Sequence, residues 1–105
     1  MSNYKKEALI RPPIFDGSNF VYWKVRITAY LQTLGTEVWD IMETRYTFPS
    51  TTPTNMAGKK QYETNAKAIN TLLGSLPQSE FIKVMQLKTA NEIWDQIILS
   101  YEGDD

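Results

Sequence analysis

The stretch Phe15-Asp16-Gly17-Ser18-Asn19-Phe20-Val21-Tyr22-Trp23 decides the fold of this chain. Asp16-Gly17 predicts a turn, and Ser18 or Asn19 can cap the start of a helix that runs to Leu34. Apolar side chains recur along this helix at helical spacing: Phe20, Trp23, Ile27, Tyr30, Leu31 and Leu34. Leaving such side chains in water costs roughly 1.5 to 3 kcal/mol each, so the rest of the chain must cover this stripe.

Composition limits both the fold and the chemistry. A chain of 105 residues is long enough for one domain with its own core, and 42% hydrophobic residues is typical of a globular protein. There is no cysteine and no histidine, which removes disulfides, zinc knuckles, thiol chemistry and the commonest general base. We therefore expect a protein that is not an enzyme, with no cofactor, no bound metal and no small-molecule substrate.

The charge balance limits the partners. A net charge of -1 argues against a nucleic-acid-binding surface as the main role, because binding phosphates needs an excess of clustered cations. No apolar run is long enough to cross a bilayer, and the first residues lead into no signal-peptide core. We expect a soluble intracellular protein that does not enter a membrane and that contacts RNA only through regions outside this sequence.

The pattern along the chain predicts an all-α fold, a compact bundle of about five helices. Residues 1–13 form an extended N-terminal arm, because Pro12 and Pro13 exclude helix there, and Ile14 and Phe15 should fold back onto the first helix. Residues 14–103 form the helical lobe, and residues 104–105 are a candidate linker to a second lobe. No stretch alternates at period two over the length of a strand.

The second and third helices follow from their end signals. Gly35 is expected as a left-handed C-cap, and Thr36 as the cap of a short second helix. The loop Thr44–Thr54 carries Tyr46 and Phe48, which either tuck under the body or face a partner. The next helix begins near Asn55 or Met56, ends at Leu73 before Gly74, and should bury one side: Tyr62, Ala66, Ile69, Leu72, Leu73 and, just beyond it, Leu76.

Two capping boxes predict the last two helices. Ser75 and Gln78 have the spacing for a short helix that turns Phe81, Ile82, Val84 and Met85 inward. Thr89-Ala90-Asn91-Glu92 is the cleaner signal, and it opens a final helix that ends at Gly103. That helix carries apolar residues on successive turns: Ile93, Trp94, Ile97, Ile98 and Tyr101.

These patterns together predict a core and one candidate surface. The predicted structural core is Phe15, Phe20, Trp23, Ile27, Leu31, Trp39, Ile69, Leu73, Trp94, Ile97 and Tyr101. Val21, Tyr22 and Val25 lie off the main stripe of the first helix. They form a candidate interface if they are exposed, and the alternative is that other helices cover them.

Charged clusters allow two interpretations each. The pairs Asp40 with Glu43 and Glu92 with Asp95 have a spacing that can hold a metal, but solvent and helix dipoles account for them better. Basic residues gather in two places: Lys59, Lys60 and Lys67 on the third helix, and Lys5, Lys6 and Arg11 in the arm. A solvated surface is the main interpretation, and a weak RNA contact is the alternative.

Several motifs resemble the Gag polyprotein of copia-type long-terminal-repeat retrotransposons. They are Phe15-x-Gly17-x-Asn19-Phe20-x-x-Trp23 with Leu31 and Trp39, then Ala66-Lys67-Ala68-Ile69, then Thr89-Ala90-x-Glu92-x-Trp94-Asp95 with Tyr101. The resemblance spans about Ile14 to Gly103. It implies the N-terminal lobe of a capsid, similar in fold to the N-terminal domain of retroviral capsid proteins. The second lobe and zinc knuckle usual in the family do not follow, so the chain is either an excised lobe or a host-adopted fragment.

Three function classes follow. The resemblance implies a structural Gag capsid lobe that associates with itself into a cytoplasmic virus-like particle. The second class, which the resemblance also permits, is a monomeric domesticated lobe that binds a peptide or a host protein in a groove near Arg11 to Phe15. The third, an enzyme using carboxylates and a metal, is the least supported by the composition.

Overall fold

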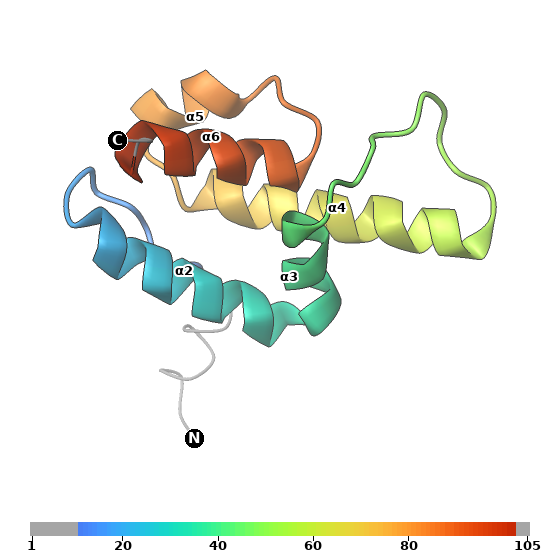
Figure 1. Ribbon diagram of the computed structural model, residues 1–105, viewed down its shortest axis with the longest axis horizontal. Helices are drawn as coiled ribbons and strands as arrows, with labels where there is room; N and C mark the ends of the chain where they lie inside the picture. Colours follow the sequence, from blue (N-terminus) through green and yellow to red (C-terminus); the bar gives the residue numbers. More distant parts are fainter. Residues whose placement is uncertain (1–10, 103–105) are drawn as a thin grey trace.

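Within residues 11–102, which are the part of the chain that the structure describes, the computed structural model contains five α-helices and no strand. The all-α fold predicted from the sequence is therefore confirmed. The helices are α2 (Phe20–Leu34), α3 (Thr36–Glu43), α4 (Met56–Gly74), α5 (Gln78–Val84) and α6 (Ala90–Glu102) (Figure 1). Most of the predicted arm, Gly103 as the last helix stop, and the linker 104–105 lie outside the described residues.

The helices pack around a single core. α3 contacts α2, α4 and α6, and α4 also contacts α6. Figure 1 shows α2 and α6 running on opposite sides of α4, with α5 beside α6 at the outer edge. The N-terminal part of α4 projects beyond the other helices, and the loop from α3 arches over it (Figure 1).

The apolar stripe of α2 faces this core as the sequence predicts. Trp23, Ile27 and Leu31 are buried. Phe20, Tyr30 and Leu34 at the edges of the stripe are half-buried and pack against the core. The periodicity of this helix therefore identified its inner face, because residues three and four apart share one side of a helix.

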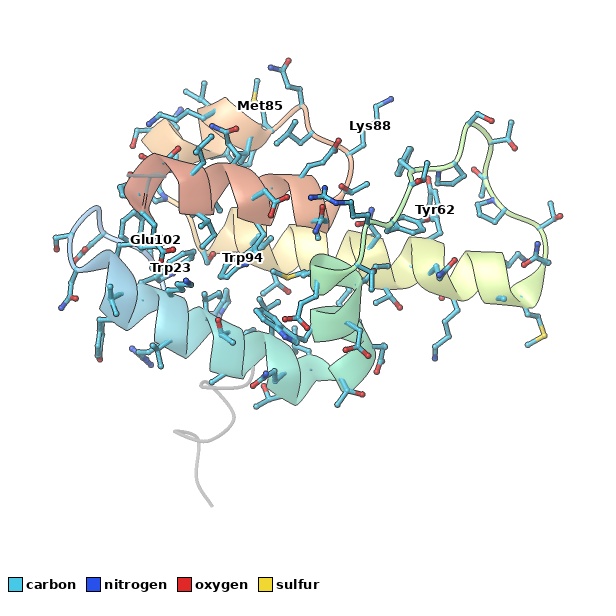
Figure 2. All side chains as sticks on the ribbon, in the orientation of Figure 1. Trp23, Tyr62, Met85, Lys88, Trp94 and Glu102 are labelled. Atoms are coloured by element: carbon cyan, nitrogen blue, oxygen red, sulfur yellow. The ribbon has the colours of Figure 1, made fainter. Side chains whose placement is uncertain are left out.

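Aromatic rings form a continuous row through the core. The ring of Phe15 lies 5.2 Å from Trp23 and 4.9 Å from Tyr101, measured between centroids. Trp23 lies 6.2 Å from Trp94, which in turn meets Trp39 edge-on at 5.8 Å. Figure 2 shows Trp23 and Trp94 in the space between α2 and α6. The row joins the arm to α2, α3 and α6.

The segment before α2 is anchored, as expected, although only one of its two apolar side chains turns inward. Phe15 is 1% exposed, and its backbone N–H donates to the carbonyl of Ser75 at 2.9 Å. The indole N–H of Trp23 donates to the carbonyl of Pro13 at 3.0 Å. Ile14 is 63% exposed, so its predicted burial is wrong. Successive side chains of an extended segment point to opposite sides, so only one of the pair can face the core.

The turn before α2 forms as predicted, but the predicted side-chain cap does not. Gly17 has a φ of 95°, and Oδ1 of Asp16 accepts hydrogen bonds from both the backbone N–H and the hydroxyl of Ser18. These bonds lower the pKa of Asp16. Asn19 occupies the N-cap position with a φ of 52°, and its side chain bonds to no helix amide. Ser18 precedes the N-cap residue, so its side chain is not at the capping position.

The junction between α2 and α3 also differs from the prediction. Gly35 has φ 146° and ψ 141°, which is not the left-handed helical conformation of a standard C-cap. Gly35 is also the N-cap of α3, and Thr36 is the first helical residue with no capping bond from its side chain. One residue therefore ends α2 and starts α3.

On α3, Val38, Ile41 and Met42 are buried, and Trp39 is half-buried.

The predicted inner face of α4 is wrong in part. Leu72 is buried as predicted, but Ala66 is exposed, and the helix also buries Thr64, Asn65, Ala68 and Thr71. Ile69 and Leu73 are half-buried against the core. The side chain of Asn65 donates to the carbonyl of Lys88 at 3.0 Å and accepts from the backbone N–H of Ala90 at 2.9 Å. A polar residue can be buried here because both ends of its amide are bonded.

The capping box predicted for α5 is wrong. The hydroxyl of Ser75 donates to the carbonyl of Leu72 at 2.7 Å, and Pro77 is the N-cap of α5. Ile82 and Met85 are 55% and 56% exposed, so their predicted burial is also wrong. Val84 is buried as predicted, and the helix also buries Glu80, whose carboxylate has a hydrogen-bonding partner on α6.

The capping box of α6 is confirmed. The N–H of Glu92 donates to Oγ1 of Thr89 at 3.2 Å, and Oε1 of Glu92 accepts from the N–H of Thr89 at 3.3 Å. Ile93 and Ile97 are buried, while Trp94, Ile98 and Tyr101 are half-buried. This signal was reliable because both of its interactions lie within four consecutive residues.

Candidate functional site

Three apolar side chains stand in solvent on the outer side of α2. Val21, Tyr22 and Val25 are 65%, 59% and 64% exposed. Val21 and Val25 are four residues apart, so they share one face of the helix, and Tyr22 adjoins them. We name these three residues the α2 strip. The structure thus places all three predicted interface residues together at the surface.

Charged residues adjoin the α2 strip: Lys24 and Arg26 on the helix itself, and Asp16 in the turn before it. The guanidinium carbon of Arg26 lies 5.6 Å from the centre of the Tyr22 ring, which places the cation over the ring face. Lys24 Nζ lies 2.7 Å from Oε2 of Glu102, so this cation links α2 to the end of α6. α2 itself contains no acidic residue. The strip is therefore an apolar surface bordered by Arg26, which makes no ion pair among residues 11–102.

Two hollows lie between α2 and the segment that precedes it. One has a volume of about 250 Å³ and is lined by Pro13, Ile14, Asp16, Ser18, Asn19, Tyr22, Trp23 and Arg26. The other has a volume of about 510 Å³ and is lined by Arg11, Pro12, Pro13, Val25, Arg26, Ala29, Tyr30 and Thr33. Pro13 and Arg26 border both. The hollows therefore follow the same side of α2 and include two residues of the strip.

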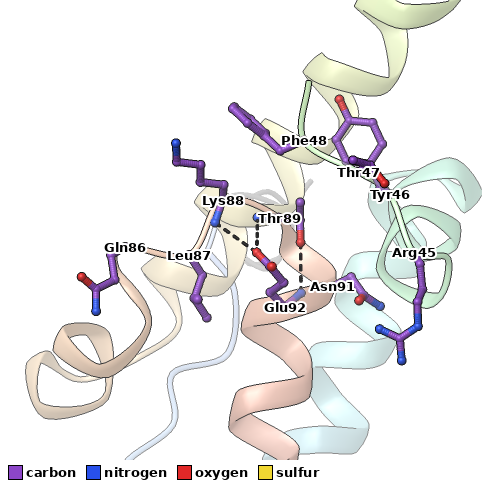
Figure 3. A pocket seen from close by; sticks show the side chains of 10 residues that line it. All are labelled: Arg45, Tyr46, Thr47, Phe48, Gln86, Leu87, Lys88, Thr89, Asn91 and Glu92. Atoms are coloured by element: carbon purple, nitrogen blue, oxygen red, sulfur yellow. Dashed lines mark hydrogen bonds between the residues drawn. The ribbon is translucent and has the colours of Figure 1, made fainter. Parts of the chain in front are cut away.

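A further pocket of about 460 Å³ lies between the loop after α3 and the start of α6 (Figure 3). Sequence reasoning did not find it, because it is formed by two loops that are distant in the sequence. Tyr46 is half-buried against the core, whereas Phe48 is 36% exposed with its ring 5.6 Å from Tyr62. The ammonium group of Lys88 lies 5.7 Å from the Phe48 ring. Of the two loop aromatics, Tyr46 tucks inward and Phe48 forms part of the pocket wall.

The polar side chains that α6 contributes to this pocket already have hydrogen-bonding partners in the fold. Glu92 accepts from the N–H groups of Lys88 and Thr89 at 3.4 and 3.3 Å (dashed in Figure 3). Asn91 donates to the carbonyl of Met42 at 2.6 Å. The bond to Met42 holds the start of α6 against α3. The bonds to Glu92 cap the N-terminal end of α6. The pocket is best described as part of the helix-capping structure.

The remaining charged residues do not gather into a reactive cluster. Among residues 11–102, no group of three or more acidic, histidine or cysteine side chains lies within reach of one metal ion. Lys59, Lys60 and Lys67 are exposed on α4, and Arg11 is exposed in the arm. Lys5 and Lys6 fall outside the described residues.

Two broader findings complete the description. None of the helices in residues 11–102 is both long and apolar enough to span a bilayer. Comparisons with models of protein families, with curated proteins and with solved structures find no match to this chain. The role of the protein is therefore inferred from its sequence motifs and from the surface of the helical lobe.

Proposed function

We propose that this chain is a structural capsid lobe of the copia Gag type, whose role is to associate with copies of itself into a cytoplasmic particle. The observation that carries the proposal is the α2 strip, with Val21, Tyr22 and Val25 standing together in solvent on a rigid helix. The proposal assigns the chain no catalytic step, no cofactor and no small-molecule substrate. RNA would be bound by other parts of a longer protein.

The positions of the motif residues support this proposal. Phe15, Trp23, Trp94 and Tyr101, which carry the resemblance, meet in the aromatic row. Residues that define a family of building blocks are expected to hold the block together, since such a protein acts through its shape. The surface residues of such a protein are then free to differ from one retrotransposon to another.

The size of the α2 strip fits a weak contact. Three exposed side chains with a charged border cannot supply a large interface, and small interfaces are typical of transient association. We expect a dissociation constant of about 0.1 to 1 mM for one contact, which corresponds to roughly 4 to 5.5 kcal/mol. Shells tolerate such weak contacts, because each subunit makes several of them at once.

A monomeric peptide-binding lobe is the second candidate. The observation in its favour is the hollow of about 510 Å³ between the arm and α2, which Pro12, Pro13 and Ala29 help to line. An extended peptide could lie along it beside Arg11 and Arg26. In that case the α2 strip would bind a different protein, and the lobe would remain monomeric.

Light scattering and small-angle X-ray scattering at rising protein concentration distinguish the two candidates. The capsid proposal predicts that the mean mass rises between about 0.1 and 1 mM. A double variant, Val21→Asp with Val25→Asp, should remain monomeric, because charge on both valines opposes burial of the strip. Met56→Asp is the matched control, since Met56 is 87% exposed on a different helix. A wild-type chain that is monomeric throughout, or a double variant that associates normally, would refute the capsid proposal.

A further inference from the structure

The α2 strip does not complement itself electrostatically. In residues 11–34 the basic side chains are Arg11, Lys24 and Arg26, and the only acidic one is Asp16. Lys24 is paired with Glu102, and the cations of Arg11 and Arg26 outnumber the single carboxylate of Asp16, so the surface around the strip carries a net positive charge. If two copies packed α2 against α2 across a twofold axis, the Arg11 and Arg26 cations of both copies would be brought to the same contact. Like charges at such a contact oppose association.

The counterpart must therefore be an acidic surface elsewhere on the chain. α3 carries Glu37, Asp40 and Glu43, but none of its apolar side chains is exposed. α3 can therefore attract Arg26, but it has no exposed apolar side chain that could cover the α2 strip.

α6 offers both charge and apolar area. Its charged residues are all acidic, and Leu99 on the same helix is 56% exposed. Asp95, Leu99 and Glu102 are spaced i, i+4 and i+7, so they share one face of the helix. We name these three residues the α6 face. An exposed leucine between two carboxylates is complementary to exposed valines beside an arginine.

Asp95 is available for a contact between copies. Its Oδ2 atom lies 4.0 Å from Nη1 of Arg45, and the two side chains are 56% and 86% exposed. Such an exposed pair at the limit of ion-pair distance contributes little. Glu102 is bonded to Lys24 at 2.7 Å, and Figure 2 places it where α6 approaches α2. Asp95 is therefore the carboxylate of this face that can accept a new cation.

We infer that the α2 strip of one copy docks on the α6 face of the next copy, with Val25 against Leu99 and Arg26 beside Asp95. The inference rests on the proposed self-association and names the surface that the strip meets. Because the two surfaces differ, the contact is head-to-tail. Repeating a head-to-tail contact builds a ring or an open chain of subunits, whereas a twofold contact would stop at a dimer.

Charge reversal tests the pairing directly. Arg26→Glu and Asp95→Arg should each weaken self-association about tenfold, because each places like charges at the contact. Mixing the two variants in equal amounts should restore association. In alternating copies, the introduced glutamate meets the introduced arginine at one contact, and the native Arg26 meets the native Asp95 at the next. The doubly substituted chain should also associate within about threefold of wild type. Lys67→Glu, an equal change of charge on α4, is the control and should associate normally.

Each outcome has a definite meaning when the mean mass is measured by analytical ultracentrifugation and folding is checked by circular dichroism. Stronger association of Arg26→Glu with wild type would indicate a twofold contact and overturn the inference. If Val25→Asp abolishes association but Asp95→Arg does not, the proposed function stands and the α6 face is the wrong counterpart. If the wild-type chain never associates, both the proposed function and this inference fail.

Discussion

The hydroxyl of Tyr101 on α6 donates a hydrogen bond to Oε2 of Glu80 on α5. Lys83 Nζ lies 3.3 Å from the same oxygen atom. The ring of Tyr101 stacks on Phe20 at 5.1 Å and meets Phe15 edge-on at 4.9 Å. One side chain therefore joins α5 to α2 and to the segment before it, at the end of α6.

This hydrogen bond gives the stability a dependence on alkaline pH. The bond to Glu80, followed by burial, raises the pKa of Tyr101 from 10.0 to about 12. The folded-state pKa is above the unfolded value, so the contribution is complete below pH 10 and is lost as the pH rises through about 12. Tyr101→Phe should cost roughly 1 to 2 kcal/mol at pH 8.

Urea unfolding of wild type and Tyr101→Phe at pH 8 and near pH 11.5 measures this effect. The difference in unfolding free energy between the two proteins should shrink at the higher pH, because only wild type loses the contribution. Tyr22→Phe controls for the loss of an exposed tyrosine. A difference that is the same at both pH values would show that the bond to Glu80 does not influence the ionisation of Tyr101.

Asn65 should be the most sensitive polar residue of α4. Asn65→Leu would leave the carbonyl of Lys88 and the N–H of Ala90 without their partner, and a buried unpaired group costs about 1 to 3 kcal/mol. We expect a loss of roughly 2 to 4 kcal/mol by urea unfolding. Asn70→Leu is the control, since Asn70 is exposed on the same helix. Equal losses in both variants would mean that the two bonds of Asn65 contribute nothing specific.

Two glycines should respond in opposite directions to alanine. Gly35→Ala should destabilise by about 1 to 3 kcal/mol, because a φ of 146° is strained for a residue with a side chain. The added Cβ would also lie 2.8 Å from the carboxylate oxygens of Glu37. Gly74→Ala should stabilise by about 0.4 to 1 kcal/mol, since a Cβ there meets no atom within 4 Å. Thermal melting of both variants checks the two signs, and a stabilised Gly35→Ala would contradict the account.

The tryptophans should differ in importance. Trp23 is 3% exposed and bonded to Pro13, so Trp23→Ala should cost roughly 3 to 5 kcal/mol and unfold much of the protein. Trp94 is half-buried at the rim of the same row, and its replacement by alanine should cost less. Circular dichroism during urea unfolding gives both values. A wild-type-like midpoint for Trp23→Ala would show that the row does not hold α2 in place.

The buried face and the cap could be predicted from the sequence for some helices but not for others. The inner face of α2 and the cap of α6 were predictable, because long periodic runs and a four-residue capping box are local signals. The inner face of α4 was not, because burying Asn65 depends on the backbone of residues 88–90, which is distant in the sequence. Ile82 and Met85 were misassigned for a related reason: α5 is too short for its periodicity to show which side is buried.

For the candidate site, the sequence located Val21, Tyr22 and Val25 off the apolar stripe, but it left open whether another helix covers them. Their exposure is decided by the packing of α2, which contacts α3 and meets α6 at Trp23 and Trp94 but leaves these three side chains uncovered.

The sequence by itself determined the helical class, the inner face of α2 and the cap of α6, because these follow from spacing along one segment. Only the tertiary structure decided which polar residues could be buried and which apolar residues stayed in water. Burial of a polar group requires a partner, and exposure of an apolar group requires that nothing packs on it. Both conditions depend on segments that are distant in the sequence, so no local pattern can encode them.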